Sequence, residues 1–244
     1  MRNFKNMNKA EYDEYMSHFN KAYNTFDALM DIAIKLDLAK LAYMKDAASL
    51  NSNPDISETF RARSLSEINK ETLVKLNSFW LTAEKLFAAF VEETDAITER
   101  LDLNDNRLTA AVTLMNAAGA QRGGIGSVPS GSVQSALVEP FSGNYEALVM
   151  LRGLADSNGL AGAVIDIDNR IKILESAKQF PTFVAQRMYN ATLAANDALM
   201  MPDVSPFVNA VCDVYGFNRP EVPEEIHHAA VRVAMGLSAA GASA

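Results

Sequence analysis

The sequence is poor in the residues on which many catalytic and metal sites depend. Its 244 residues include a single cysteine, Cys212, which excludes a disulfide within the chain and a zinc site built from several cysteines. We expect Cys212 to be buried, because it lies on the apolar side of a short predicted helix. The three histidines of the chain leave few candidates for a catalytic base.

Long apolar stretches are also missing. No run of about 18 apolar residues occurs, so the sequence predicts no transmembrane helix. Residues 1–16 lack the apolar core of a secretory signal. We therefore expect a protein of the cytoplasm, or of a particle such as a virion that is assembled there, and not one exported by a signal peptide.

Basic residues do not dominate the chain. It has 22 lysines and arginines against 30 aspartates and glutamates, for a net charge of −8. Broad binding to nucleic acid needs a basic face that displaces counterions from phosphates, and we expect no nucleic-acid partner. The composition, with 49% apolar and 21% charged residues, is that of a globular protein.

Charge of either sign is scarce between residues 108 and 164. The charged residues of this stretch are Arg122, Glu139, Glu146, Arg152 and Asp156. A surface layer normally carries far more charge. We expect this stretch to form either the inner layer of the fold or a face that meets another subunit.

The apolar spacing in the first hundred residues predicts two very long helices. Asn8 and Glu11 have the spacing of a capping box at a helix start. Apolar residues then recur at steps of three and four from residue 12 to residue 36, and the stretch 49–55 contains the turn-forming proline and asparagines that end this helix. The second helix should run from about residue 57 to residue 103, with the same apolar spacing.

Two such helices joined by a short turn should form an antiparallel, coiled-coil-like hairpin. Their apolar faces are too broad for one hairpin to cover, so a third and a fourth helix should pack on them. The aromatic residues that we expect to meet inside the hairpin are Phe79, Trp80, Phe87 and Phe90 on the second helix, and Phe19, Tyr23 and Phe26 on the first. We divide the chain into a long hairpin, residues 1–103, and a region of shorter helices, residues 104–244.

The second region predicts a bundle of shorter helices. Asn104 or Asp105 should cap the first of them, and Pro181 should separate two others. Ser205, with Pro206 in the first helical position, should begin the next helix. No convincing alternating strand occurs, and the predicted fold class is therefore all-α.

The stretch "RGGIGSVPSGSV", residues 122–133, resembles a phosphate-binding loop in composition only. It has no lysine, it follows a predicted helix, and position 129 is proline where a dinucleotide fingerprint needs glycine. We interpret residues 119–134 as a glycine-rich arm that is ordered by contact with another chain. The predicted interface residues are Arg122, Gly123, Gly124, Ile125, Gly126 and Val128.

The best candidate for a metal site is "PEEIHH". Glu224 with His227, and Glu225 with His228, have the i to i+3 spacing that places a carboxylate and an imidazole on one helical face. A di-iron bundle needs a second such pair and further glutamates, and the remaining histidine, His18, has no glutamate three positions before it. We therefore predict no metal, no cofactor and no catalytic residues.

Residues 185–217 resemble in part the last helix of LemA-type helical proteins. The resemblance rests on a Tyr-Asn pair, Tyr189 and Asn190, a later asparagine, Asn196, and a closing Gly-Phe, Gly216 and Phe217. The sequence has no counterpart of that family's basic LKRR segment or of its membrane anchor. We do not assign the chain to that family.

The sequence favours a non-enzymatic structural subunit of a larger assembly, for example a phage or virion component. The expected partners are other protein subunits, in a homo-oligomer or a hetero-assembly. Two alternatives stay open. One is a membrane-active helical protein of the pore-forming or ejection type, and the other is a helical-bundle metal enzyme.

Overall fold

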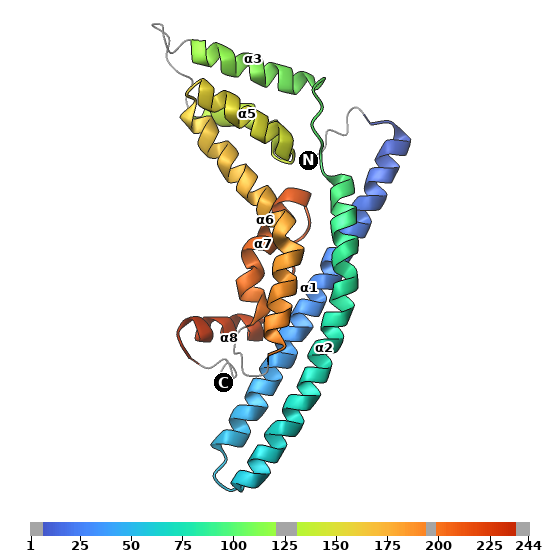
Figure 1. The fold of residues 1–244 in the computed structure, drawn as a ribbon, viewed down its shortest axis with the longest axis vertical. Coiled ribbons are helices and arrows are strands. Elements are labelled where there is room, and N and C mark those ends of the chain that lie inside the picture. The colour runs from blue at the N-terminus through green and yellow to red at the C-terminus, as the bar shows by residue number, and fades with distance from the viewer. Residues whose placement is uncertain (1–6, 121–130, 194–198, 238–244) are drawn as a thin grey trace. The chain divides into compact units, whose positions relative to one another are not determined.

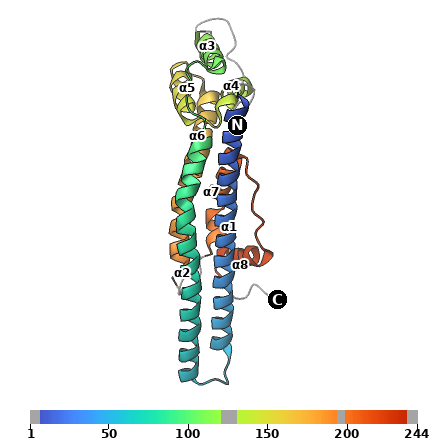
Figure 2. The same cartoon turned by 90° about the vertical axis from the view of Figure 1, so that its right-hand side faces the viewer.

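The computed structural model describes residues 7–120, 131–193 and 199–237, and these fold into helices without any strand (Figure 1). This confirms the predicted all-α class. The elements are α1 (Lys9–Ser52), α2 (Glu58–Ile97), α3 (Asn106–Ala120), α4 (Gly131–Val138), the 3-10 helix η3 (Glu139–Phe141), α5 (Tyr145–Ser157), α6 (Ala161–Ala191), α7 (Met200–Tyr215) and α8 (Glu224–Ala234). The two longest helices, α1 and α2, lie side by side as the predicted hairpin in both views (Figures 1 and 2).

Local side-chain contacts fix the start of α1 and the turn into α2. The Glu11 N–H donates to Asn8 Oδ1 and the Asn8 N–H donates to Glu11 Oε2, each at 3.0 Å, which confirms the capping box. At the turn, the Arg61 guanidinium donates to the carbonyl oxygens of Leu50, at 3.1 Å, and Asn53, at 2.9 Å. It thereby satisfies a carbonyl that the end of α1 leaves without a helical partner.

The second helix is shorter than predicted, because it ends at Ile97 and not near residue 103. Two contacts with the start of α5 hold the backbone that follows it. Asn144 Nδ2 donates to the Arg100 carbonyl at 3.0 Å, and the Leu101 N–H donates to Glu146 Oε2 at 3.1 Å. These partners lie more than forty positions away in sequence, so helical spacing gives no sign of them.

The chain divides into two compact units. One contains residues 1–16, 95–178 and 210–217, and the other contains residues 17–94, 179–209 and 218–244. We call them unit 1 and unit 2 and describe each by itself. The division of the sequence at residues 103 and 104 stays a prediction.

The core of unit 2 confirms that a third helix covers the hairpin. The rings of Phe26 in α1, Phe90 in α2 and Phe180 in α6 pack against one another, with centroids 5.3 to 6.4 Å apart. All three side chains are buried. The other aromatic residues of α2 are less buried than predicted, since Phe79, Trp80 and Phe87 are only half-buried. The rings of Trp80 and Phe87 pack against each other, with centroids 6.3 Å apart.

Pro181 does not separate two helices, contrary to the prediction, because α6 continues through it. A proline inside a helix removes one backbone hydrogen bond and costs about 3 kcal/mol. Phe180 and Val184 on either side of it are fully buried, and each contributes about 1.5–3 kcal/mol on burial. Tertiary packing therefore outweighs the local preference.

The core of unit 1 is built largely from the low-charge stretch. Its buried side chains come from α3, α4, η3, α5 and the first half of α6, and several of them are alanines that allow close helix packing. The buried residues are Leu108, Ala111, Met115, Ala118, Val138, Phe141, Ala147, Leu148, Leu151, Ala155, Leu160, Ala163, Ile167 and Leu174. The inner-layer interpretation of the stretch is thus correct for these side chains.

Candidate functional site

The solvent side of α3 carries no charge. We define the α3 face as the exposed residues of this helix after its first turn: Thr109, Ala110, Thr113, Leu114, Asn116, Ala117 and Ala120. Leu114, at the middle of this face, is 52% exposed. The opposite side of α3 packs into the core of unit 1, so the helix is apolar on its inner side and uncharged on its outer side.

The only charged residue of α3, Arg107, forms an ion pair with Asp105 at the start of the helix. Arg107 Nη2 lies 2.6 Å from Asp105 Oδ2, and the guanidinium lies 5.8 Å from the centroid of the Phe141 ring. Asp105 also accepts a hydrogen bond from the Arg107 N–H at 2.8 Å, which confirms it as the N-cap. Hydrogen bonding to Arg107 holds the pKa of Asp105 below its usual range.

Other charges of the low-charge stretch are also engaged within unit 1. Arg152 pairs with Asp168 at 2.5 Å, and Glu146 accepts the backbone hydrogen bond from Leu101 described above. The stretch therefore forms an inner layer, as one of the two alternatives predicted, and whether it also meets another subunit stays a prediction. Its inner side chains form a core, and its outer side chains leave an exposed surface without charge on α3.

The predicted interface arm adjoins this surface in sequence. Residues 121–130 lie outside the described residues, and with them Arg122, Gly123, Gly124, Ile125, Gly126 and Val128. The predicted bounds of the arm, 119–134, were too wide, because Gly119 and Ala120 belong to α3 and residues 131–134 belong to α4. Val133 in α4 is 50% exposed.

A polar cavity of about 560 Å³ lies in unit 1, between the end of α2 and the start of α5. Among its described lining residues are Glu99, Asp102 and Asp105, together with Arg107 and Asn144. Arg107 is already paired with Asp105, and Asn144 caps α5 by accepting a hydrogen bond from the Ala147 N–H at 3.0 Å. The cavity therefore contains polar groups that hold the fold together, and its described lining includes no histidine or cysteine.

A buried polar cluster in unit 2 was missed by the sequence analysis. Asp37 and Lys40 lie three positions apart on α1, and both side chains are fully buried. The Asp37 carboxylate accepts hydrogen bonds from the backbone N–H groups of Met200 at 2.7 Å and Met201 at 2.9 Å, at the start of α7. Lys40 Nζ donates to the carbonyl oxygens of Ala191, at 3.2 Å, and Leu193, at 2.5 Å, where α6 ends.

Each charge of this cluster matches the helix end that it meets. The N-terminus of a helix carries a partial positive charge and its C-terminus a partial negative one, so an acid suits α7 and an amine suits α6. Burial nevertheless raises the pKa of Asp37 to about 6, against the opposing effects of the two backbone hydrogen bonds and of Arg187. The cluster fastens the ends of α6 and α7 to the middle of α1.

The sequence also misplaced the start of α7. Ser205 does not cap this helix, because α7 begins at Met200 and Ser205 Oγ donates to the Met201 carbonyl within it. The cap is the carboxylate of Asp37, more than 160 positions earlier in the chain. Arg187 of α6 pairs with Asp203 beside it, which adds a second tie between α6 and the first turn of α7.

Except for His227, the glutamates and histidines of α8 that made it the best candidate for a metal site have other partners in the structure. His228 Nε2 lies 3.4 Å from Glu224 Oε1, one full turn away, and Glu225 pairs with Lys45 of α1 at 3.8 Å. His227 is exposed. In the part of the chain that the structure describes, no three histidine, cysteine, aspartate or glutamate side chains lie close enough together to hold a metal ion.

The remaining histidine belongs to an ion pair of the hairpin. His18 Nδ1 lies 2.5 Å from Glu93 Oε2. This hydrogen bond is the main cause that lowers the pKa of Glu93, and the charges of Lys21 and His18 lower it further. Cys212 is buried, as predicted. None of the helices described here is both long and apolar enough to cross a membrane.

The α3 face is thus exposed and uncharged, while the opposite side of the same helix belongs to the core of unit 1. The local resemblance of residues 185–217 to LemA-type proteins is not supported by wider comparison. No protein-family model, curated protein or solved structure matches the chain.

Proposed function

We propose that the protein is a non-enzymatic structural subunit of a larger assembly, in which the α3 face meets a neighbouring protein subunit. The observation that carries this proposal is that the outer side of α3 is exposed and bears no charge from Thr109 to Ala120. Surfaces of small domains usually have about 25–35% charged residues. An uncharged, partly apolar helix side is typical of a protein–protein contact.

The charge of the whole chain supports the same proposal. With a net charge of −8, two copies repel each other across most of their surfaces. A contact through a surface without charge avoids both this repulsion and the cost of removing charged groups from water. The α3 face therefore suits a homomeric neighbour, and it equally suits a different subunit of the same assembly.

The arm, which joins α3 to α4 in sequence, belongs to the proposed contact, because it follows directly after the α3 face. Ordering a glycine-rich backbone costs on the order of 1–2 kcal/mol per residue, and a neighbouring subunit can offset that cost. Limited proteolysis should therefore cut this arm in the free chain and spare it in the assembly. Protection caused by ATP or a dinucleotide instead would contradict the proposal.

A virion or phage particle is one assembly of the proposed kind. In that case the protein would act in the cytoplasm, or inside a particle assembled there. The partners in this proposal are other protein subunits, without nucleic acid.

The test places a charge at the centre of the α3 face. Leu114→Glu should reduce the mass of the native complex in solution, because it introduces a carboxylate into an uncharged contact. Leu103→Glu is the matched control, since Leu103 is a more exposed leucine of unit 1 that lies outside the α3 face. A complex whose mass is unchanged by Leu114→Glu would refute the proposal.

Two further measurements separate this proposal from the alternatives. Binding of the wild-type chain to vesicles of anionic lipid, lost in Leu114→Glu, would make the α3 face a membrane-binding surface instead. Stoichiometric iron, zinc or manganese in the purified protein would favour the metal enzyme.

A further inference from the structure

An exposed apolar stripe runs along α2 in unit 2. We define the α2 stripe as Phe60, Glu67, Val74 and Leu81, which follow one another at steps of seven residues and therefore lie in a row on one side of the helix. The three apolar members are 55%, 65% and 59% exposed. Large apolar side chains in a row on a helix need a partner, because a helix buries a continuous apolar row against another element.

The end of the hairpin near this stripe is incompletely packed. Beyond Met44 in α1 and before Leu76 in α2, no side chain of the hairpin is buried. A groove of about 460 Å³ lies there, beside the first half of the stripe. It is lined by Asp46, Ser49, Leu50, Phe60, Ser64, Glu67, Ile68 and Glu71.

Charged residues flank the α2 stripe in an ordered way. At about 100° per residue, Glu71 lies about 50° to one side of the stripe, and Lys75 lies about 100° to the same side. Going away from the hairpin turn, this flank is first acidic and then basic, and the change of sign occurs at the level of Val74. Glu71 and Lys75 are exposed, and their side chains form no ion pair among the described residues.

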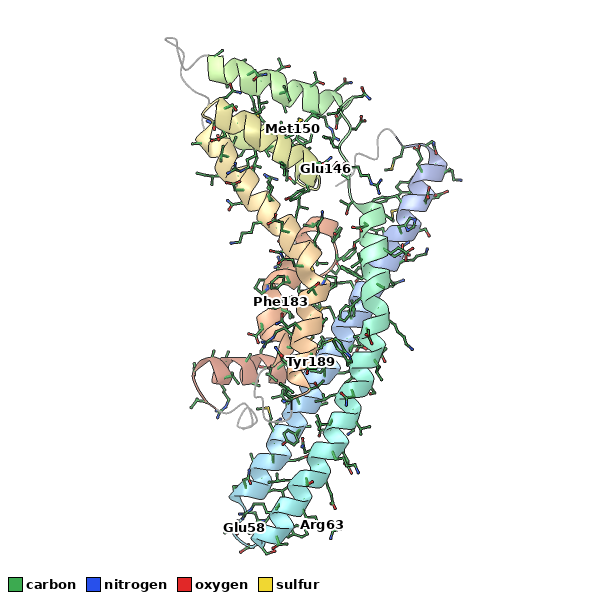
Figure 3. All side chains as sticks on the ribbon, in the orientation of Figure 1. Glu58, Arg63, Glu146, Met150, Phe183 and Tyr189 are labelled. Carbon is green, nitrogen blue, oxygen red and sulfur yellow. The ribbon has the colours of Figure 1, made fainter. Side chains whose placement is uncertain are left out.

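The other flank has the opposite order. Arg63 and Lys70 come before Val74, and Glu84 comes after it. Arg63 is on the outer side of α2 near the hairpin turn (Figure 3), where it pairs with Glu67 at 3.1 Å. Both flanks thus reverse their charge at the same point of the helix.

We propose that a second copy of this chain packs antiparallel along the α2 stripe, with the two-fold axis at Val74. In an antiparallel helix pair, each flank meets the same flank of the partner in the reverse direction. Because each flank of α2 reverses its charge at Val74, every acidic segment then meets a basic one. Glu71 of one copy lies near Lys75 of the other, and Arg63 lies at the level of Glu84.

The apolar residues fit the same register. Val74 meets Val74 of the second copy at the axis, and Leu81 of each copy reaches the level of Glu67 on the other, beside the groove. The groove then receives an apolar side chain, and each hairpin contributes two helices to a four-helix arrangement.

A parallel pair would be less favourable at the stripe itself. It would place Glu67 directly opposite Glu67 of the second copy, with two carboxylates in the row that should be apolar. In such a pair the neighbour of Glu71 would be Lys70 and not Lys75. This difference allows the two orientations to be separated by exchange of charges.

This inference deepens the proposed function and rests on it, because it names a second copy as one of the neighbouring subunits. It concerns a different helix in a different unit from the α3 face. The two surfaces can therefore be tested by separate variants of the full-length chain.

The experiment measures the dimer dissociation constant by sedimentation. Glu71→Lys and Lys75→Glu should each weaken the dimer about tenfold, since each reverses two symmetric pairs. The double variant Glu71→Lys with Lys75→Glu should restore the wild-type constant. Glu14→Lys, at an exposed position of α1, is the matched control and should have no effect.

The outcomes distinguish the possibilities. Restoration by Glu71→Lys with Lys70→Glu, in place of the predicted pair, would show a parallel dimer and overturn the inference. Dissociation that follows Leu114→Glu but no variant of α2 would overturn it as well, while the proposed function would stand. A chain that stays monomeric at every concentration would overturn the inference, while the proposed function would stand, because it also allows a different subunit as the neighbour. Val74→Glu should abolish the dimer by placing two carboxylates at the axis.

Discussion

Replacing Asp37 by asparagine removes a buried negative charge and retains a side-chain oxygen. In the wild-type chain, the Asp37 carboxylate accepts two backbone hydrogen bonds, from the N–H groups of Met200 and Met201. Asparagine can keep one of these bonds through its carbonyl oxygen. The substitution therefore changes the charge of the cluster more than its shape.

The magnitude follows from the pKa of Asp37. Burial raises this pKa from 3.8 to about 6, so the folded chain favours the neutral acid. The stabilisation from the neutral form is fully present below pH 3.8 and is lost as the pH rises through 6. The difference between the two pKa values corresponds to about 3 kcal/mol in the free energy of unfolding.

The assay compares the free energies of unfolding of the wild-type chain and Asp37→Asn by urea titration at pH 4 and at pH 7. The asparagine variant has no charge to gain at this position. Its stability relative to the wild type should therefore rise by about 2 kcal/mol between the two pH values, since at pH 4 the unfolded wild-type chain is already partly ionised at this position. Asp27→Asn, at an exposed position of the same helix, controls for the loss of a surface aspartate.

The opposite sign would refute this reasoning. If the wild-type chain gained stability over Asp37→Asn as the pH rose, the start of α7 and Lys40 would stabilise the carboxylate by more than burial destabilises it. The ends of α6 and α7 would then be held by a favourable ionised pair, and the pKa of Asp37 would lie below its usual range.

Three further substitutions test other parts of the structure. Phe90→Ala should lower the free energy of unfolding by about 3–5 kcal/mol, because it empties the centre of the aromatic cluster in unit 2; urea unfolding measures it, and an unchanged midpoint would contradict the packing. Gly119→Ala should destabilise the chain by about 1–3 kcal/mol, because the added methyl group would overlap the Asn158 side chain from its Cβ outward, and Asn158→Gly in the same chain should relieve part of that loss. Double replacement of His227 and His228 by glutamine should leave the thermal unfolding temperature and the assembly unchanged at pH 7, and a metal that is lost with these histidines would revive the enzyme hypothesis.

Features set by short-range spacing could be predicted from the sequence. The capping box at Asn8 and Glu11 and the cap at Asp105 depend on residues within a few positions of one another. The two long helices also follow from apolar residues at steps of three and four. The scarcity of charge between residues 108 and 164 likewise predicted a layer that is not an ordinary surface. Composition alone could not divide that stretch into a core side and an exposed side, because this division depends on which helices pack against α3.

Features set by distant contacts could not be predicted. The start of α7 is fixed by Asp37, and the end of α2 is followed by backbone that Asn144 and Glu146 hold. A buried aspartate and a buried lysine within a long helix look like surface residues in the sequence, because their helical spacing alone does not reveal the helix ends that they meet. One signal was available: Asp37 and Lys40 lie among residues that are otherwise apolar on several sides of the helix.

The mass of the native full-length chain in solution tests the central claim most directly. The chain alone has a mass of 26.6 kDa, and an assembly subunit should give a multiple of that value, or a larger complex with its partner. We predict that this larger mass falls when Leu114→Glu places a charge on the α3 face, and that Leu103→Glu leaves it unchanged. A mass of 26.6 kDa at every concentration, with or without the substitutions, would contradict the assembly function.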